Sequence, residues 1–525
     1  MEFRCSPVFG TALVVCFALT ARIPCAAQAQ QNPQMTAVDA GGNAALGELQ
    51  SQVRELKDLV LQLQQETTAS RAEISKLRQE LRAQRTASNA ASAVGSADND
   101  QSAADSAPGT ADLGQRLQHL EEDEQLLSSK VDEQYQTKVE SASKYRLRFS
   151  GIVLFNLFGN TGYTDNQDVP TWVLRPDPMD SAGSVGGTLR QSILGFEVFG
   201  PDVFGAHSRG NVNFDFGGGF PATDNGVNSG LARLRTATIR LDWKDTSVVA
   251  GQDGLFISPQ APTSFASLIV PALSYSGNLW SWTPQLRVEH RFEFSNHSNV
   301  SLQGGVLDPL TGEPPDDFNY IWFRAPDAGE ESRQPAFAAR VAYSHPLLGR
   351  TFTVGTGAYY SREYWGFKRN VNGYAATADW SLPLDRRFTL SGFLYRGQAI
   401  GGLGAALSRS VVYNGPLTDP ATAVLPVNSV GGWAQLKYQP MPKLEFNAAF
   451  GQDNPFAADI RAFGIQSESY ANPFLTRNRA AFGNVIYRPR SDLLLSLEYR
   501  RLRTFSIYDE SYAAGQLNLA MGILF

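Results

Sequence analysis

The connections between candidate strands alternate between short and long from about residue 145 to the end of the chain. In several candidate strands apolar side chains recur at every second position, and a period of two places successive side chains on opposite faces of a strand. The short connections include 244–246 and 383–385, and the long ones include 159–188, 253–283 and 398–429. Short turns at one rim and long loops at the other are typical of a transmembrane β-barrel, and a soluble sandwich or propeller is not expected to alternate so regularly. The chain is therefore expected to be an all-β transmembrane barrel.

The alternating pattern predicts about 16 antiparallel strands, and a count of about 16–18 fits a barrel of this kind. An even count places both ends of the barrel at the short-turn rim. Closure then requires 516–525 to pair with 145–158, with Leu517, Leu519 and Met521 facing lipid. The predicted strands are 145–158, 189–199, 209–216, 231–243, 247–252, 284–294, 300–307, 336–344, 351–362, 371–382, 388–397, 430–439, 444–452, 476–488, 493–504 and 512–525.

Charged and apolar side chains lie on opposite faces of several predicted strands. In 284–294, Leu286 and Val288 alternate with Arg287 and Glu289. A charge that faces lipid at mid-membrane depth costs about 2–4 kcal/mol, so the charged faces are expected to line a lumen, and about sixteen strands enclose an aqueous channel. The predicted pore-lining residues are the bases Arg148, Arg240, Arg287, Arg291, Arg340, Lys437 and Arg500 and the acids Asp242, Glu289, Glu293, Glu445 and Glu498.

The predicted pore-lining bases outnumber the acids by seven to five. A small basic excess in a lumen lowers the barrier for anions. A second interpretation stays open, in which the wall arginines pair with the wall carboxylates and hold the barrel rigid. A shift of one residue in register would also move any of these side chains to the lipid-facing side.

The N-terminal segment, residues 1–29, has the pattern of a secretory signal peptide. Arg4 precedes the apolar run 8–19, and small residues form a cleavage site at 27–29. All three cysteines lie in this segment. The mature chain is therefore expected to contain no disulfide and no thiol chemistry.

Residues 30–85 are predicted to form an α-helical coiled coil ahead of the barrel. From Leu46 to Leu81, nine of the eleven a and d heptad positions are apolar. Val or Ile at a with Leu at d favours two helices, so the heptad alone does not decide between a dimer and a trimer. A long helix that folds back on the barrel or on itself is the alternative. A flexible linker is predicted at 86–111 and a second, shorter helix or coiled coil at 112–143, followed by the barrel at 144–525.

Composition and motifs exclude several classes of function. The formal net charge is −6, and no block of basic residues indicates nucleic-acid binding. No pair of the histidines has the spacing of metal ligands, and no Gly-x-Ser-x-Gly or phosphate-binding loop occurs. Beyond residue 29 no run of about 18 apolar residues predicts a spanning helix. The chain is expected to be no enzyme and to bind neither cofactor nor metal.

The predicted barrel ends on Phe525, and its pattern resembles that of the trimeric general porins of Gram-negative bacteria. The coiled coil ahead of it resembles that of the DcaP-like and phosphate-selective porins, so the resemblance covers the architecture from about residue 40 to the end. It implies a homotrimer in the bacterial outer membrane, with the coiled coil in the periplasm. It also implies recognition of Phe525 by the barrel-assembly machinery and contact with outer-membrane lipid and lipopolysaccharide.

The resemblance further implies that the third long loop, 253–283, folds inward as a constriction. The candidate constriction residues are Asp253, Gln260, Ser264 and Asn278. The loop contains one acid and no base, whereas the loop of general porins presents several carboxylates opposite wall arginines. A strong transverse field at the constriction is therefore not expected.

Three functions fit the sequence. The first is a porin for passive diffusion of small hydrophilic solutes with a weak preference for anions. The second is a substrate-specific channel for a carboxylate, a phosphate or a sugar. The third is a structural tether in which the coiled coil extends from the outer membrane and the pore is incidental.

Overall fold

The computed structural model describes residues 146–525, with the exception of 180, 221–229, 295–296, 315–323, 470–474 and 509. The predicted signal peptide (1–29), coiled coil (30–85), linker (86–111) and second helix (112–143) lie outside the described residues. None of the helices in the described part of the chain has the length and hydropathy of a membrane-spanning helix.

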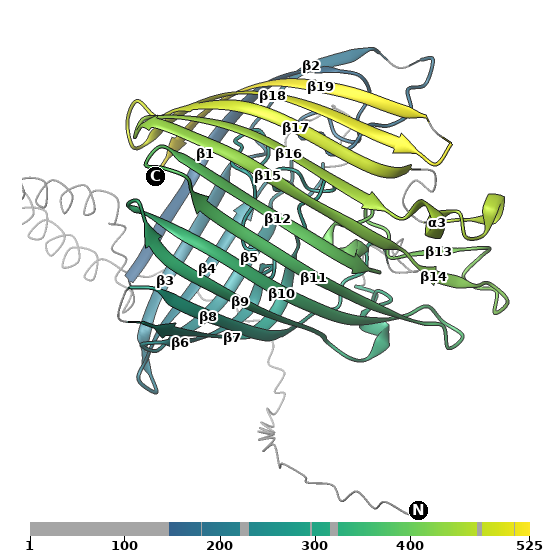
Figure 1. Ribbon diagram of the computed structural model, residues 1–525, viewed down its shortest axis with the longest axis horizontal. Helices are drawn as coiled ribbons and strands as arrows, with labels where there is room; N and C mark the ends of the chain where they lie inside the picture. The colour runs from purple at the N-terminus through teal and green to yellow at the C-terminus, as the bar shows by residue number, and fades with distance from the viewer. Residues whose placement is uncertain are drawn as a thin grey trace, which may run out of the picture. The chain divides into compact units, whose positions relative to one another are not determined.

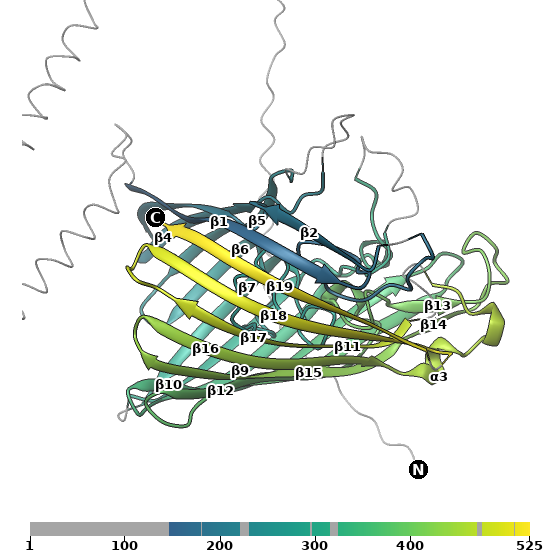
Figure 2. The same ribbon diagram turned by 90° about the horizontal axis from the view of Figure 1, so that it is seen from above.

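The described strands form a closed antiparallel barrel of sixteen strands, which Figures 1 and 2 show from two sides. All sixteen predicted strands are present, with small shifts at their ends. Beyond these, the described residues form three short strands and four short helical elements, whose bounds are given below. The barrel strands are β1 (Arg146–Thr161), β3 (Ile193–Val203), β4 (Ala206–Asp215), β5 (Arg233–Asp242), β6 (Thr246–Gly254), β7 (Trp282–Glu293), β8 (Asn299–Leu307), β9 (Ala336–Leu347), β10 (Arg350–Tyr364), β11 (Asn370–Pro383), β12 (Phe388–Gln398), β15 (Asn428–Met441), β16 (Leu444–Pro455), β17 (Leu475–Tyr487), β18 (Leu493–Ser506) and β19 (Ser511–Leu524).

The first and last strands close the barrel as predicted. β1 pairs with β19 from Ile152 opposite Leu524 to Thr161 opposite Gly515. Phe525 extends this pairing, because its backbone N–H donates to the carbonyl of Gly151 and its own carbonyl accepts from the N–H of Gly151. The C-terminal residue is therefore part of the closing seam.

The second predicted strand, 189–199, is wrong at its start. β2 (Gly183–Thr188) pairs with the later half of β1 and β3 pairs with its earlier half, so residues 189–192 leave the sheet between them. The side chain of Ser192 holds this break by accepting the backbone N–H of Leu154 at 3.0 Å. Arg190 turns inward and forms a buried ion pair with Asp168 at 2.8 Å. Side-chain bonding therefore replaces the backbone ladder over these four residues.

The long connections contain the remaining short elements, and these lie at the end of the barrel opposite the C-terminus in Figure 1. β13 pairs with β14, and no residue of this hairpin belongs to the barrel wall. The elements are η1 (Glu330–Ser332), η2 (Gly401–Leu403), β13 (Val411–Tyr413), β14 (Val424–Pro426), α3 (Ala457–Ile460) and η3 (Gly464–Gln466).

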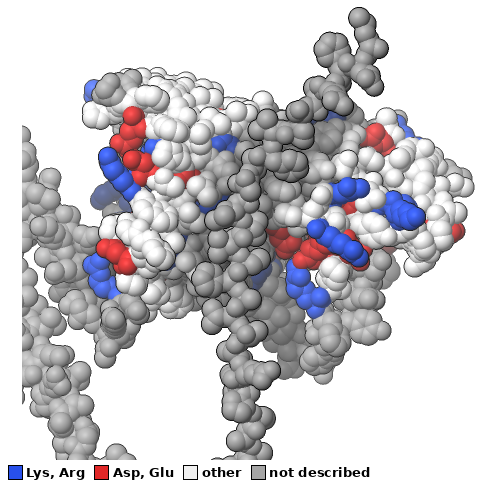
Figure 3. Space-filling model, turned by 90° about the horizontal axis from the view of Figure 1, so that it is seen from below, with Lys and Arg blue, Asp and Glu red and all other residues white. Residues whose placement is uncertain are grey.

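The strands expose one apolar face and bury the other. In β18 the side chains of Leu495, Leu497 and Tyr499 are exposed on the outside, while Glu498 and Arg500 between them are buried. In the parts of the surface that Figure 3 leaves uncovered, charged side chains lie toward both ends of the barrel. This alternation matches the prediction that apolar side chains face lipid and charged ones face the interior.

The largest buried apolar cluster lies inside the barrel. Ile257 and Leu279, from the segment between β6 and β7, are almost fully buried in it. They pack with inward side chains of the wall that include Phe393, Trp433 and Phe482. A loop therefore supplies part of the core, and its position determines where the lumen remains open.

Candidate pore and its inner loop

The segment 255–281, here called the inner loop, lies inside the barrel and is bonded to the far wall. Thr377 of β11 donates its hydroxyl to the carbonyl of Ile257 at 3.0 Å. Gln260 donates its side-chain amide to the carbonyl of Trp380 at 3.0 Å. The backbone N–H of Thr263 donates to Gln435 of β15 at 2.6 Å. The loop thus crosses from β6 to strands that lie far away in the sequence.

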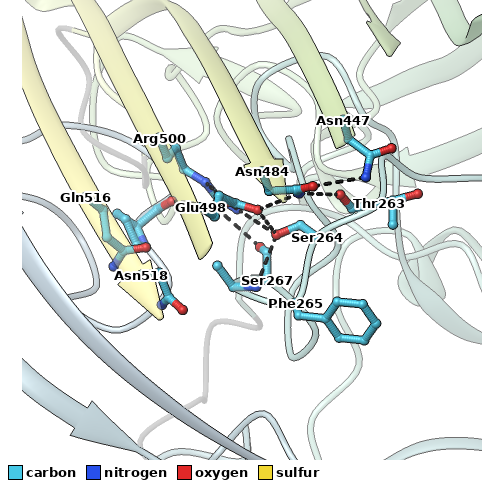
Figure 4. A network of polar contacts seen from close by, with 12 residues as sticks. Thr263, Ser264, Phe265, Ser267, Asn447, Asn484, Glu498, Arg500, Gln516 and Asn518 are labelled. Carbon is cyan, nitrogen blue, oxygen red and sulfur yellow. Dashed lines mark hydrogen bonds and ion pairs between the residues drawn. The ribbon is translucent and has the colours of Figure 1, made fainter. Parts of the chain in front are cut away.

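A network of polar contacts holds the middle of the inner loop against β17 and β18 (Figure 4). The Ser264 hydroxyl donates to the Glu498 carboxylate at 2.6 Å. Asn484 donates to the same carboxylate at 3.1 Å and to the carbonyl of Thr263 at 2.8 Å. Arg500 forms an ion pair with Glu498 at 2.8 Å. The carboxylate is thereby satisfied by three donors, which a buried charge requires.

This network corrects the prediction for two pore-lining residues. Glu498 and Arg500 do lie on the inward face of β18, but both are buried beneath the inner loop. Their charges bond to each other and to the loop. Alternation along a strand gives the face of a side chain, and it does not reveal what covers that face.

The inner loop is also tied to the wall near the start of the barrel. Asn156 of β1 donates to the carbonyl of Phe265 at 2.8 Å. Gln191, in the break between β2 and β3, accepts the backbone N–H of Leu268 at 2.6 Å. Arg235 of β5 donates to the carbonyl of Leu268 at 3.1 Å. Anchors on both sides fix the loop across the interior.

A glycine permits the closest approach of the inner loop to the wall. Gly277 has a φ of 101°, in the region that side chains with a Cβ rarely adopt. A Cβ added there would lie 2.1 Å from the carbonyl oxygen of Gly432 and 2.7 Å from that of Gln452. Both the conformation and the space therefore require glycine.

The four predicted constriction residues have different positions. Asp253 belongs to β6 and not to the loop, and its carboxylate binds Arg287 at 2.7 Å. Asn278 is buried and donates within the loop, to the carbonyl of Ala272 at 2.9 Å. Gln260 and Ser264 bond the loop to the wall, as described above. The placement of Asp253 corrects the prediction, because β6 continues two residues beyond its expected end.

A chain of ion pairs, here called the charge belt, runs along the inner wall from β1 to β11. Its first part joins β1 to β5 through Glu197 and Arg209. Arg148 lies 3.5 Å from Glu197, Arg209 lies 3.8 Å from Glu197, and Arg209 lies 2.5 Å from Asp242. The belt consists of Arg148, Glu197, Arg209, Asp242, Arg240, Glu289, Arg287, Asp253, Gln303, Arg340 and Asp379.

Glu289 is the central member of the belt. It accepts from Arg240 at 3.1 Å, from Arg287 at 2.8 Å and from Gln303 at 3.0 Å. Gln303 accepts in turn from Arg340 at 3.2 Å. One carboxylate on β7 therefore links the strands on both sides of it.

The far end of the belt crosses β10 by means of a glycine. Arg340 of β9 binds Asp379 of β11 at 2.7 Å, although β10 lies between them. Gly355 of β10 occupies the intervening position, and a Cβ there would lie 2.6 Å from the Arg340 guanidinium and 2.7 Å from the Asp379 carboxylate. The absence of a side chain at Gly355 allows this ion pair to form.

The ion pairs of the inner wall leave little of the basic excess that the sequence predicts. Each of the seven predicted pore-lining bases forms an ion pair: Arg291 binds Glu293 at 3.7 Å, Lys437 binds Glu445 at 3.1 Å, and the other five are described above. The belt contains five arginines and five carboxylates, so its formal charges cancel. The interpretation in which wall charges pair with each other is the one that the structure shows.

From Arg148 to Glu289 the guanidinium groups of the belt are more exposed than its carboxylates, whereas beyond this part Arg287 is 9% exposed against 29% for Asp253, and Arg340 and Asp379 are both buried. The side chains of Arg148, Arg209 and Arg240 are 47%, 40% and 32% exposed, while Glu197, Asp242 and Glu289 are 22%, 17% and 19% exposed. Inward side chains of β4, β5 and β8 are mostly only half-buried, whereas those of β9, β17 and β18 are mostly buried. The inner loop therefore covers part of the interior and leaves the wall at β4, β5 and β8 more open.

Several wall residues were missing from the sequence prediction. Glu197, Arg209 and Asp379 lie within predicted strands at inward positions, so alternation could have identified them. Arg233 and Arg235 both point toward Asp215, at 2.7 Å and 3.7 Å, because the pairing of β4 with β5 shifts register between Asn213 and Phe214. The sequence contains no signal for this shift.

Glu313 joins two long loops at the rim opposite the C-terminus. Its buried carboxylate accepts the backbone N–H groups of Ser410 at 2.8 Å and Val411 at 3.2 Å. Burial raises the pKa of Glu313 to about 7, against the lowering effect of these hydrogen bonds. No group of three or more potential metal-ligating side chains occurs among the residues that the structure describes.

Solved structures of outer-membrane channels are similar to the described barrel. The outer membrane channel DcaP of Acinetobacter baumannii matches with a TM-score of 0.56 at 14% identity, over 74% of this chain and 100% of that chain. The anion-selective porin from Comamonas acidovorans matches with a TM-score of 0.45 at 12% identity, over 73% and 100%. No protein-family model matches the sequence, and no curated protein shows significant similarity to it. The described chain therefore has the fold of an outer-membrane porin barrel.

Proposed function

We propose that the protein is an outer-membrane porin for passive diffusion of small hydrophilic solutes. The observation that carries this proposal is the half-exposed part of the charge belt, from Arg148 of β1 to Glu289 of β7, which stays solvated beside an inner loop that crosses the interior. An interior wall of solvated charges is suited to an aqueous path, because a dry core would not accommodate them. The DcaP structure, described as an outer membrane channel, supports it.

The proposed pore has a weak preference for anions. The belt is neutral in sum, but from Arg148 to Glu289 its guanidinium groups are the more exposed partners, so a solute that passes this part meets positive charge first. The paired carboxylates lie within about 4 Å behind them and cancel most of the field at longer range. The preference is therefore expected to be modest.

A substrate-specific channel is the second candidate, and one group of residues favours it. Arg233 and Arg235 share the single carboxylate of Asp215. Both guanidiniums also stack over the ring of Trp282, each 4.8 Å from its centroid. Two arginines with one acid and an aromatic face form a suitable site for a carboxylate or phosphate.

The proposal also includes the assembly and export features that the sequence predicts and the described residues do not test. We propose a homotrimer, cleavage after a signal peptide, recognition of Phe525 by the assembly machinery, and a coiled coil in the periplasm. The coiled-coil heptad and the position of Phe525 in the closing seam support these expectations. A tether function would rest on the coiled coil alone, with an incidental pore.

Planar bilayers test the channel function with the purified full chain. We expect ohmic conductance steps in groups of three. In a KCl gradient, we expect a small reversal potential whose sign shows that chloride passes more easily than potassium. The control is gel electrophoresis of unheated and heated samples, which shows that the protein added to the bilayer is folded. The absence of conductance from such protein would refute the channel and leave the tether.

A further inference from the structure

Four arginines form a cluster on the outside of the barrel, at the long-loop end of β17 and β18. Arg477 and Arg479 lie on the outward face of β17, and Arg501 and Arg503 lie on that of β18. Arg479 and Arg503 are direct partners in the strand register. Like charges opposite each other destabilise a sheet, so this arrangement has a cost that a bound anion would remove.

No carboxylate of the described chain forms an ion pair with this outward arginine cluster. The carboxylates of β16 to β19 are Glu445, Asp453 and Glu498, and all three lie on the inward face. Within the cluster, the guanidiniums of Arg477 and Arg479 stack over the ring of Phe505, at 4.0 Å and 4.6 Å. Their Nε atoms are shielded from solvent and have no hydrogen-bond partner among the described residues. The wall positions these cations without neutralising them.

A hollow of about 470 Å³ lies between these side chains on the outer surface. Arg479, Arg501 and Arg503 line it, together with Ser511 and the ring of Phe450. The Ser511 hydroxyl accepts from Arg503 at 2.9 Å and keeps its own proton for a further acceptor. The hollow thus combines three guanidiniums, a hydroxyl and an apolar side.

The depth of the cluster matches the surface of a bilayer. Arg503 follows Leu493 by ten residues, which rise roughly 25 Å along the barrel axis at about 3.3 Å per residue and a tilt of about 40°. The outward side chains between Leu493 and Arg501 are Leu495, Leu497 and Tyr499, all exposed, and Arg501 lies eight residues beyond Leu493, at roughly 20 Å. An apolar band of a barrel is about 25 Å tall, so the arginines lie where lipid headgroups begin.

We propose that the outward arginine cluster binds a phosphate group of an anionic glycolipid in the outer leaflet, of the lipid A type. Planar guanidiniums bind phosphate oxygens in bidentate fashion, and the apolar band below the cluster accommodates acyl chains. We choose lipid over a second copy of this chain because the cluster borders an exposed apolar band and lines a hollow on the outer surface, and the test below separates the two occupants. The proposal rests on the orientation given above, with long loops outside, and it is independent of conductance.

The test is lipid binding by the full chain folded in detergent, with native mass spectrometry as the readout. Bisphosphorylated lipid A is the probe, and dephosphorylated lipid A and inorganic phosphate are the comparison probes. We expect R479Q/R503Q to bind bisphosphorylated lipid A about tenfold more weakly than the wild type. The matched control is R362Q, since Arg362 is an outward arginine at the same end that faces Asn372 in the register. If R479Q/R503Q fails to fold, R501Q takes its place.

Several outcomes would overturn the proposal. One is unchanged affinity in R479Q/R503Q, and another is equal binding of dephosphorylated lipid A by the wild type. Inorganic phosphate that binds as tightly as lipid A would identify a free-anion site in place of a lipid site. A changed number of copies in R479Q/R503Q with unchanged lipid binding would identify an interface between copies. Conductance without selective lipid binding would refute this proposal and leave the proposed function intact. Selective lipid binding without conductance would refute the proposed function and leave this proposal intact.

Discussion

Replacing Glu289 by glutamine tests whether the charge belt sets ion selectivity. Glu289 accepts from Arg240, Arg287 and Gln303 at 3.1, 2.8 and 3.0 Å. Glu289→Gln keeps the shape of the side chain and removes one negative charge. The belt then contains five arginines and four carboxylates, so it gains a net charge of +1, and two guanidiniums lose their shared partner.

The size of the effect follows from Coulomb attraction across the lumen. An anion passing about 7 Å from one unbalanced charge gains about 0.6 kcal/mol in water, and screening over a Debye length of about 8 Å reduces this to roughly 0.25 kcal/mol. The barrier for a cation rises by a similar amount. The two changes together raise the anion-to-cation permeability ratio about twofold, since RT is about 0.59 kcal/mol.

The assay is the reversal potential of the full chain in planar bilayers under a KCl gradient. Glu293→Gln is the matched control, because Glu293 is 64% exposed, lies 3.7 Å from Arg291 and is near the short-turn rim. Its charge is screened by solvent, so the control is expected to change the ratio much less. An unchanged ratio in Glu289→Gln, or equal shifts in both variants, would refute the argument that ions pass close to the belt.

Three further predictions concern the loops. Gly277→Ala is expected to destabilise the docked inner loop by roughly 2 kcal/mol or more, seen as a lower temperature of heat modification, whereas Gly304→Ala, with open space around its Cβ position, should be close to neutral. Ser264→Ala removes a donor from the buried Glu498 and should cost about 1.5–3 kcal/mol in the free energy of unfolding; a wild-type value would show that the Figure 4 network adds nothing. Glu313 has its pKa raised by burial to about 7, so the docking that it supports is strongest below its ordinary value of about 4.3, weakens as pH rises toward 7, and levels off above it. Hydrogen exchange at the Val411 N–H should follow this trend, and Glu313→Gln should abolish it.

The barrel could be predicted from the sequence because its main requirement is local. Each strand needs only a period of two, with apolar residues toward lipid and polar ones toward the interior, and this pattern was visible along most of the predicted strands, with the outward arginines of β17 and β18 as a departure. The closing contact of Gln516 to Phe525 with β1 then followed from an even strand count. The exception was the segment 189–192, where side chains such as Ser192 replace the ladder and the period of two is lost.

By itself, the sequence determined the strand count, the inward side of most wall charges and the long segment between β6 and β7. Only the tertiary structure decided which charges meet and which are covered. Ser264 and Glu498 are 234 residues apart, and Arg340 reaches Asp379 only because Gly355 leaves room between them. The physical reason is that alternation fixes a side chain's face, whereas pairing depends on register between strands and on where the inner loop docks. The balance between an open belt and a covered wall is therefore a property of the closed barrel.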